Sequence, residues 1–221
     1  MVEHQPSKLI TRVRFPSPAP FNMNFEIVLA TTNQHKADEY RALLSKHGIT
    51  LYSFKDLNLT LPKVKEDGKT FLDNALIKAK AAAKIVNMPV LADDSGLCIK
   101  ALNDFPGIKT ARFAKKCGSQ INANHKIVNM LKYKDHSASF HCVIALLNVK
   151  KEPLIFIGNA NGKISDEYHN EESFGYDPIF ISDEVGTTFH LMDKKKKNEV
   201  SHRAKACKKL ITALKLYGYI K

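Results

Sequence analysis

Apolar and polar positions follow strand-like runs and helical spacings along most of the chain. Residues 25–32, FEIVLATT, form a strand-like apolar run that breaks into the polar turn TTNQHK. In the following ADEYRALLSKHG, Tyr40, Leu43 and Leu44 share one helical face, and Gly48 is suited to end the helix. A strand, a polar turn and a helix in this order predict the beginning of an α/β unit.

Three further helices are predicted downstream. The first spans residues 70–86, where Thr70 and Asp73 have the spacing of a capping box and apolar residues recur at helical spacing. A weaker helix covers residues 121–132, and the clearest one begins after Ser201 with a regular apolar stripe. No interdomain linker separates these elements.

The remaining regular segments are expected to be strands. VLADD, residues 90–94, follows the first of these helices, and residues 139–164 predict two strands joined by a turn around residues 150–153. The adjacent carboxylates Asp93 and Asp94 are then expected at the end of a buried strand, where the chain turns through ADDSG.

Composition is that of a soluble globular protein. The 221 residues are 44 % hydrophobic and 25 % charged, which suits one domain or two closely packed lobes. We expect a cytoplasmic protein, because no run approaches the ~18 apolar residues of a membrane span and the N-terminus lacks the apolar region of a signal peptide. The four scattered cysteines form no CxxC pair and predict reduced thiols.

The first 22 residues differ from the rest of the chain. They include the proline-rich PSPAP, which offers few hydrogen bonds for a helix or a sheet. One back-translation of RVRFPSPAP also resembles the 3′ part of a transfer RNA gene. We therefore expect residues 1–22 to be a disordered or spurious extension, translation to start at Met23, and residues 23–221 to form a single domain.

The net charge of +12 favours an anionic partner, such as nucleic acid, a phosphorylated small molecule or an acidic membrane surface. Much of the excess is lysine, which also accumulates on solvated faces. The charge alone therefore does not select among these partners.

The turn TTNQHK is suited to a phosphate. Backbone N–H groups and the helix dipole favour an anion at a helix N-terminus, Thr31 and Asn33 add hydrogen-bonding side chains, and Lys36 adds a positive charge. An ordinary polar turn, with Asn33 as the helix cap, fits the same residues.

Carboxylates in two segments suggest a metal. A turn needs only one Asp, so the pair in ADDSG favours Mg²⁺, which takes hard oxygen ligands and bridges to phosphates. Glu66 supplies a further carboxylate before the helix at Thr70. The alternatives are a plain turn for ADDSG and a solvated position for Glu66.

Two segments near the C-terminus could hold a nucleobase. In SFGYDP, Phe174 and Tyr176 can stack on a base, and Asp177 is held extended by the proline after it; a turn with core aromatics is the alternative. In SHR, the cations His202 and Arg203 lie in the first turn of a helix, where the helix dipole disfavours positive charge, and such local conflicts are typical of functional sites. The alternative is that both are ordinary exposed basic residues. We expect residues 194–197, KKKK, to be mostly a solvated loop with at most one lysine used for a ligand.

Taken together and in this order, these segments resemble the inosine triphosphate pyrophosphatase family. The resemblance is carried by VLATTNQHK, EDGKTFLDNALIKA, LADDSGL, PGIKTARFA, FHCV, FGYDPIF and K-x₃-SHR, and it runs from about Phe25 to the C-terminal helix. It implies an α/β fold with a long twisted mixed β-sheet, flanking helices, and two lobes around a central active-site cleft. It also implies a homodimer and Mg²⁺-dependent cleavage of ITP, dITP and XTP to the monophosphate and pyrophosphate.

The resemblance also implies roles for single residues. Glu66 and Asp94 would hold the metal, with Asp94 the general base. Substrate would contact Thr31, Thr32, Asn33, Gln34, His35, Lys36, Ser95, Phe174, Gly175, Tyr176, Asp177, Lys197, His202 and Arg203. The chain departs from the family at Thr32 and His35, where glycine is frequent, and at residues 172–173, which replace glycines.

Base selection would follow from hydrogen-bond polarity. Hypoxanthine and xanthine present an N1–H donor and an O6 acceptor, which Asp177 and either Arg203 or His202 can match. Adenine presents the reverse pattern and would leave those groups unpaired.

Three other functions fit parts of the sequence. One is a nucleotide pyrophosphatase acting on modified pyrimidines or ordinary dNTPs, and another is an inactive relative. The third is a basic nucleic-acid-binding module, which we do not expect because the acidic ADDSG segment would repel a phosphate backbone.

Overall fold

The fold is an α/β architecture built on one mixed sheet, as predicted. The computed structural model describes residues 24–221, so the predictions for residues 1–22 and for a start at Met23 lie outside the described chain. Its strands are β1 (Phe25–Leu29), β2 (Ile49–Ser53), β3 (Val90–Ile99), β4 (Phe105–Pro106), β5 (Ser137–Leu147), β6 (Leu154–Ile164) and β7 (Phe180–Ser182). Its α-helices are α1 (Gln34–Leu44), α2 (Phe71–Ala83), α3 (Thr110–Lys116), α4 (Gln120–Leu131), α5 (Lys194–Val200) and α6 (His202–Leu216).

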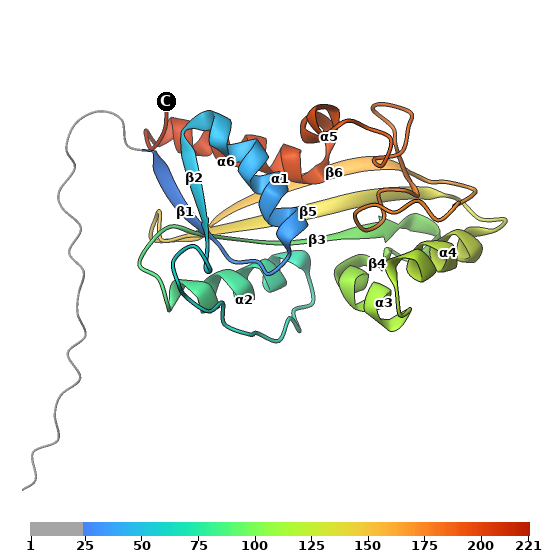
Figure 1. The fold of residues 1–221 in the computed structure, drawn as a ribbon, viewed down its shortest axis with the longest axis horizontal. Helices are drawn as coiled ribbons and strands as arrows, with labels where there is room; N and C mark the ends of the chain where they lie inside the picture. Colours follow the sequence, from blue (N-terminus) through green and yellow to red (C-terminus); the bar gives the residue numbers. More distant parts are fainter. Residues whose placement is uncertain (1–23) are drawn as a thin grey trace, which may run out of the picture.

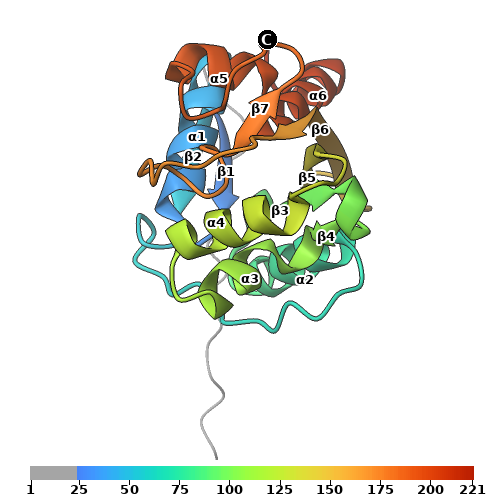
Figure 2. The same ribbon diagram turned by 90° about the vertical axis from the view of Figure 1, so that its right-hand side faces the viewer.

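The sheet has the strand order β2-β1-β3-β5-β6-β7, with β4 paired to the end of β3. β1 runs parallel to β2 and β3, and the other pairs are antiparallel. The long strands β3, β5 and β6 extend the molecule along one axis (Figure 1). Helices α1, α5 and α6 cover one face, α2 lies under the other, and α3 and α4 lie together at the far end (Figures 1 and 2). Every helix in residues 24–221 is too short or too polar to cross a bilayer.

Local sequence signals explain most helix boundaries. Thr70 and Asp73 form the predicted capping box of α2, because each side chain accepts a hydrogen bond from the other's backbone N–H. Asn33 caps α1 and Ser201 caps α6 through their side-chain oxygens, also as predicted. Residues 194–196 are exposed as expected, but the expected loop is wrong, because Asp193 caps a short helix there.

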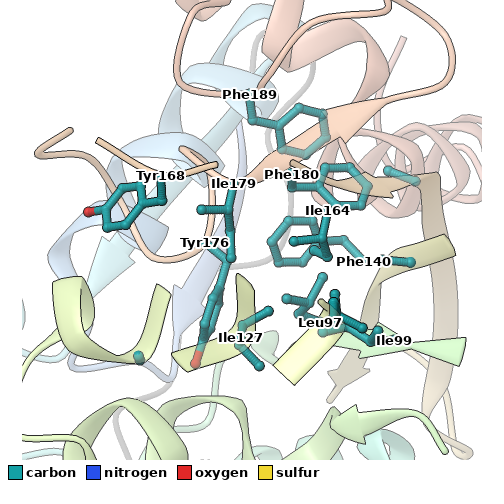
Figure 3. Close-up of a cluster of buried hydrophobic side chains, with 14 of the residues drawn as sticks. Leu97, Ile99, Ile127, Phe140, Ile164, Tyr168, Tyr176, Ile179, Phe180 and Phe189 are labelled. Atoms are coloured by element: carbon teal, nitrogen blue, oxygen red, sulfur yellow. The ribbon is translucent and has the colours of Figure 1, made fainter. Parts of the chain in front are cut away.

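Side chains along each strand point alternately to the two faces of the sheet, so the core is divided between these faces. Ile27 and Leu91 pack with α1 and α6, whereas Val28 and Val90 pack with α2. A third cluster fills the far end around Phe140 (Figure 3). The molecule therefore has two packed lobes on one continuous sheet.

Helix α6 lies very close to the sheet at Gly158 in β6. A Cβ atom there would come within 2.1 Å of the His202 carbonyl oxygen and 2.4 Å of the Ala206 nitrogen. Only glycine permits this approach. The first turn of α6, which carries two of the predicted site residues, is therefore held directly on the sheet.

The predicted turn at ADDSG is wrong, because β3 continues through it to Ile99. Strand β5 pairs with β3 along its whole length and keeps it extended. On the opposite edge, β1 reaches only Leu91 and β4 begins only at Cys98, so between them no strand of the described chain pairs with β3. This gap leaves Asp93, Asp94 and their neighbours beside an open sheet edge.

Candidate active site

A cavity of about 950 Å³ lies at the open edge of β3, between the two lobes. Such a volume suits a small-molecule ligand. Among the residues that line it are fourteen of the predicted site residues: Thr31, Thr32, Asn33, Lys36, Glu66, Asp94, Ser95, Phe174, Gly175, Tyr176, Asp177, Lys197, His202 and Arg203. Segments separated by more than 160 residues in the sequence therefore converge on one site.

Two predicted residues do not line the cavity. Gln34 donates from Nε2 to Asp38 Oδ1 at 2.8 Å along the outer surface of α1. The His35 ring lies 5.1 Å from the Phe174 ring, centroid to centroid. Both are the first helical residues after the Asn33 cap, and direct substrate contact for them stays a prediction.

The turn before α1 brings a cation to the open edge of β3. Asn33 Oδ1 accepts from the Lys36 backbone N–H, and Lys36 Nζ lies 2.8 Å from Asp93 Oδ2. Burial would raise the pKa of Asp93, but the charges of Lys36 and Arg203 outweigh it and hold the pKa well below its usual value. Asp93 is therefore an ionised partner that positions Lys36.

Asp93 and Asp94 do not act as a pair. Adjacent residues in a strand point to opposite faces, so Asp93 meets α1 while Asp94 meets α2. The prediction that both share one Mg²⁺ is wrong for Asp93. Within residues 24–221, no group of three or more His, Cys, Asp or Glu side chains has the geometry to hold a metal.

Asp94 instead shares a cation with Glu66. Lys78 Nζ, from α2, lies 2.7 Å from Glu66 Oε2 and 3.0 Å from Asp94 Oδ1. The second Asp94 oxygen accepts from Asn74 Nδ2 at 3.2 Å. Burial raises the pKa of Asp94 above its usual value, against the opposing charge of Lys78. A carboxyl group whose pKa is raised in this way is suited to proton transfer.

A second ionic cluster includes three residues that line the cavity, Asp177, Lys197 and Arg203. Lys197 Nζ lies 2.8 Å from Glu39 Oε1 and 2.5 Å from Asp177 Oδ2, and Arg203 also pairs with Glu39. Burial would lower the pKa of Lys197, but Asp177 and Glu39 raise it, so the ammonium stays charged. Ion pairs therefore hold Lys197, Asp177 and Arg203 in place beside the cavity.

His202 and Arg203 are buried, so the alternative of two exposed basic residues is wrong. The His202 ring stacks on Phe140 with centroids 4.7 Å apart. Burial, with the charges of Arg203 and Lys197, lowers the pKa of His202 well below its usual value. A neutral ring removes the expected conflict between His202 and the dipole of α6.

Two buried side-chain nitrogens in the described chain have no hydrogen-bond partner: His202 Nδ1 and Arg203 Nε. Both residues line the cavity. Unpaired buried polar atoms are rare in native proteins and indicate a missing partner.

The two aromatic residues of FGYDP have different environments. Phe174 lies at the cavity, with Lys197 Nζ 5.6 Å from its ring centroid. The Tyr176 ring is buried in the cluster around Phe140, and its hydroxyl donates to the Thr110 carbonyl at 3.2 Å (Figure 3). Tyr176 therefore fits the alternative of a core aromatic residue, and Phe174 is the residue available to stack on a base.

Sequence reasoning missed two charged residues on helices. Glu39 follows Lys36 by three positions on α1, and Lys78 follows Asn74 by four positions on α2. Such spacings place the members of each pair on one helix face. Two polar residues at this spacing, on a helix face whose other residues are buried, are the sequence pattern that could have identified Glu39 and Lys78.

Comparison with known proteins gives a consistent result. A model of the Ham1 family matches residues 27–213. A dITP/XTP pyrophosphatase of Coxiella burnetii is 40 % identical over 194 residues, which cover 86 % of this chain and 96 % of that protein. One from Geobacter sulfurreducens is 40 % identical over 183 residues, covering 81 % and 92 %.

Solved structures agree in fold. The structure of a Ham1 protein from Coxiella burnetii superposes with a TM-score of 0.76 at 40 % identity, covering 86 % of this chain and 98 % of that one. A nucleoside-triphosphatase or dITP/XTP pyrophosphatase from Mycobacterium abscessus gives a TM-score of 0.66 at 32 % identity, covering 84 % and 98 %. The similarity extends over nearly the whole described chain.

Proposed function

The chain belongs to the Ham1 family, and we propose that it hydrolyses purine nucleoside triphosphates with non-standard bases, namely ITP, dITP and XTP. The products are the nucleoside monophosphate and pyrophosphate, so the enzyme clears such nucleotides from the pool. One observation carries this proposal: a single cavity is lined by two carboxylates that share one cation, by a helix N-terminus and by buried basic side chains. The relatives named dITP/XTP pyrophosphatase support it.

Mg²⁺ is the cofactor that Glu66 and Asp94 fit. Glu66 and Asp94 both reach one ammonium group, so their oxygens converge on one cation position. Mg²⁺ is usually held by one or two carboxylates together with substrate phosphates and water. When bound, it supplies positive charge that offsets the triphosphate and stabilises the leaving pyrophosphate.

The residues of this chain supply binding and proton transfer. Thr31, Asn33 and Lys36, at the start of α1, hold phosphate oxygens. Asp94, at the open edge of β3, accepts a proton from water as it attacks the α-phosphorus. The bond to the oxygen between the α- and β-phosphorus then breaks, and that oxygen leaves with pyrophosphate.

Base selection takes place at Asp177, His202 and Arg203, which line the same cavity. Asp177 Oδ2 accepts from Lys197, and its second oxygen can accept from the N1–H of hypoxanthine or xanthine. Arg203 or His202 donates to O6, and Phe174 stacks on the base. Adenine offers an acceptor at N1 and a donor at C6, so each contact would be unfavourable.

We extend the proposal to the setting of the enzyme. Residues 23–221 form one catalytic domain, which acts as a homodimer in the cytoplasm without a stable nucleic-acid partner. The family resemblance supports the dimer. The composition and the lack of a membrane-spanning helix in the described chain support a site of action away from the bilayer.

Substrate turnover tests the function directly. We expect pyrophosphate release from ITP, dITP and XTP in the presence of Mg²⁺, and at least about 30-fold lower kcat/KM for ATP, because two mismatched contacts cost ~1–3 kcal/mol each. Chelation of the metal should abolish release. A preference for dUTP or for ordinary dNTPs would contradict the proposal and favour a related pyrophosphatase.

A further inference from the structure

One lysine lies between the carboxylates of Glu66 and Asp94 in the cavity. Lys78 Nζ is within 3.0 Å of an oxygen of both Glu66 and Asp94. Its side chain is 17 % exposed, whereas that of Glu66 is 42 % exposed. Asn74 also donates to Asp94, so both Asp94 oxygens are bound by donors from α2.

Helix α2 fixes where this ammonium lies. The helix begins at the Thr70–Asp73 capping box, and Ala75, Ala79 and Ala82 pack it tightly against the sheet. Asn74 and Lys78 are one turn apart and point at the same carboxylate. The Lys78 contact is therefore a built feature of the fold, unlike a surface ion pair between two mobile side chains.

An ammonium and a divalent cation cannot both use these oxygens at close range. Two positive charges about 4 Å apart repel each other by several kcal/mol at the effective dielectric of a protein surface. Metal binding by Glu66 and Asp94 therefore requires Lys78 to leave at least one of them. Without another anion in reach, the largely buried ammonium would lose its partners at substantial cost.

We propose that Lys78 is a resident counter-ion which a divalent metal displaces, and that the nucleotide makes this exchange favourable. The inference rests on the proposed function. Triphosphate oxygens offer the displaced ammonium a new partner, so metal and nucleotide bind together with positive coupling. The nucleotide-free enzyme binds divalent metal only weakly, because Lys78 competes for the same carboxylates.

Metal binding to the nucleotide-free protein tests this without any turnover. The probe is Mn²⁺, titrated and followed by electron paramagnetic resonance or calorimetry. The variant Lys78→Met keeps most of the length of the side chain and removes its charge. We expect it to bind Mn²⁺ at least tenfold more tightly than the wild type, because both carboxylates are then free.

A matched variant separates local competition from total charge. Lys65 lies at the rim of the same cavity, with a side chain that is 86 % exposed and an ammonium 3.3 Å from Asp67 Oδ2. Lys65→Met removes the same charge close to Glu66, and we expect it to change Mn²⁺ affinity less than threefold. The double variant Glu66→Gln with Lys78→Met should lose the gain, which assigns the bound Mn²⁺ to this carboxylate pair.

The outcomes are distinct. Unchanged or weaker Mn²⁺ binding by a folded Lys78→Met protein overturns the inference, and so does an equal gain from Lys65→Met. If Lys78→Met does not fold, Lys78→Gln carries the same expectation. ITP turnover by the wild type tests the proposed function alone, so its failure can be told apart from failure of the exchange.

Discussion

Replacing Asp94 by asparagine is expected to lower kcat for ITP at least about 10³-fold. A general base contributes about 10²–10⁴-fold, and the same carboxylate also serves as a metal ligand. Asparagine keeps the shape of the side chain, and its one oxygen can still accept from either Lys78 or Asn74. It is a poor proton acceptor and a weaker ligand, so the chemistry should fail while the fold persists.

The control for Asp94 is an identical change outside the cavity. Asp38 lies on the outer side of α1, where it pairs with Arg41. Asp38→Asn should keep wild-type turnover, and both variants should show thermal unfolding close to that of the wild type. Undiminished hydrolysis by Asp94→Asn would remove Asp94 from the mechanism.

Replacing Asp177 is expected to remove much of the discrimination between ITP and ATP. Alanine deletes the acceptor for N1–H, so the ratio of kcat/KM for ITP to that for ATP should fall about 10- to 100-fold, equivalent to ~1–3 kcal/mol. Asp177→Asn provides a second test, since its amide can accept from hypoxanthine or donate to adenine. Steady-state rates with both nucleotides give the ratio.

Asp177 also pairs with Lys197, so a loss of activity alone would not establish base recognition. Asp183→Asn, an exposed change nearby in the sequence, should leave the ratio as it is. If Asp177→Ala or Asp177→Asn folded and kept the wild-type preference for ITP over ATP, the assignment of Asp177 to N1 would be wrong.

Local signals were sufficient to predict most of the fold. These signals lie within single segments of the sequence, so they can be recognised without knowledge of tertiary contacts. They are the capping box at Thr70, the cap at Ser201 and the apolar stripes of α2 and α6. The β5–β6 hairpin was equally clear. The short helix α5 was missed because a run of four lysines looks solvated, although the Asp193 cap starts a helix there.

The end of β3 could not be placed by sequence alone. ADDSG has turn-forming residues, but ladder pairing with β5 through Ile99 keeps it extended. That pairing depends on residues about 45 positions away, so no local pattern reveals it. Once the strand is extended, Asp93 and Asp94 necessarily face opposite sides, and the idea of a shared metal no longer holds for Asp93.

Candidate site residues could be predicted where they belong to a polar motif that interrupts the regular pattern. They could not be predicted where they lie within regular helices. Phosphate-turn and SHR residues interrupt the regular pattern and were found. Glu39 and Lys78 were not, because charged residues on amphipathic helices normally face water. Only the tertiary structure shows that Lys78 lines the cavity and that Glu39 pairs with two residues that line it, Lys197 and Arg203.

Hydrolysis of ITP in ¹⁸O-labelled water tests the central claim most directly. If water activated by Asp94 attacks the α-phosphorus, mass spectrometry should find one ¹⁸O atom in the inosine monophosphate and none in the pyrophosphate. Label in the pyrophosphate, or release of single phosphate groups, would show attack at another phosphorus and contradict the account.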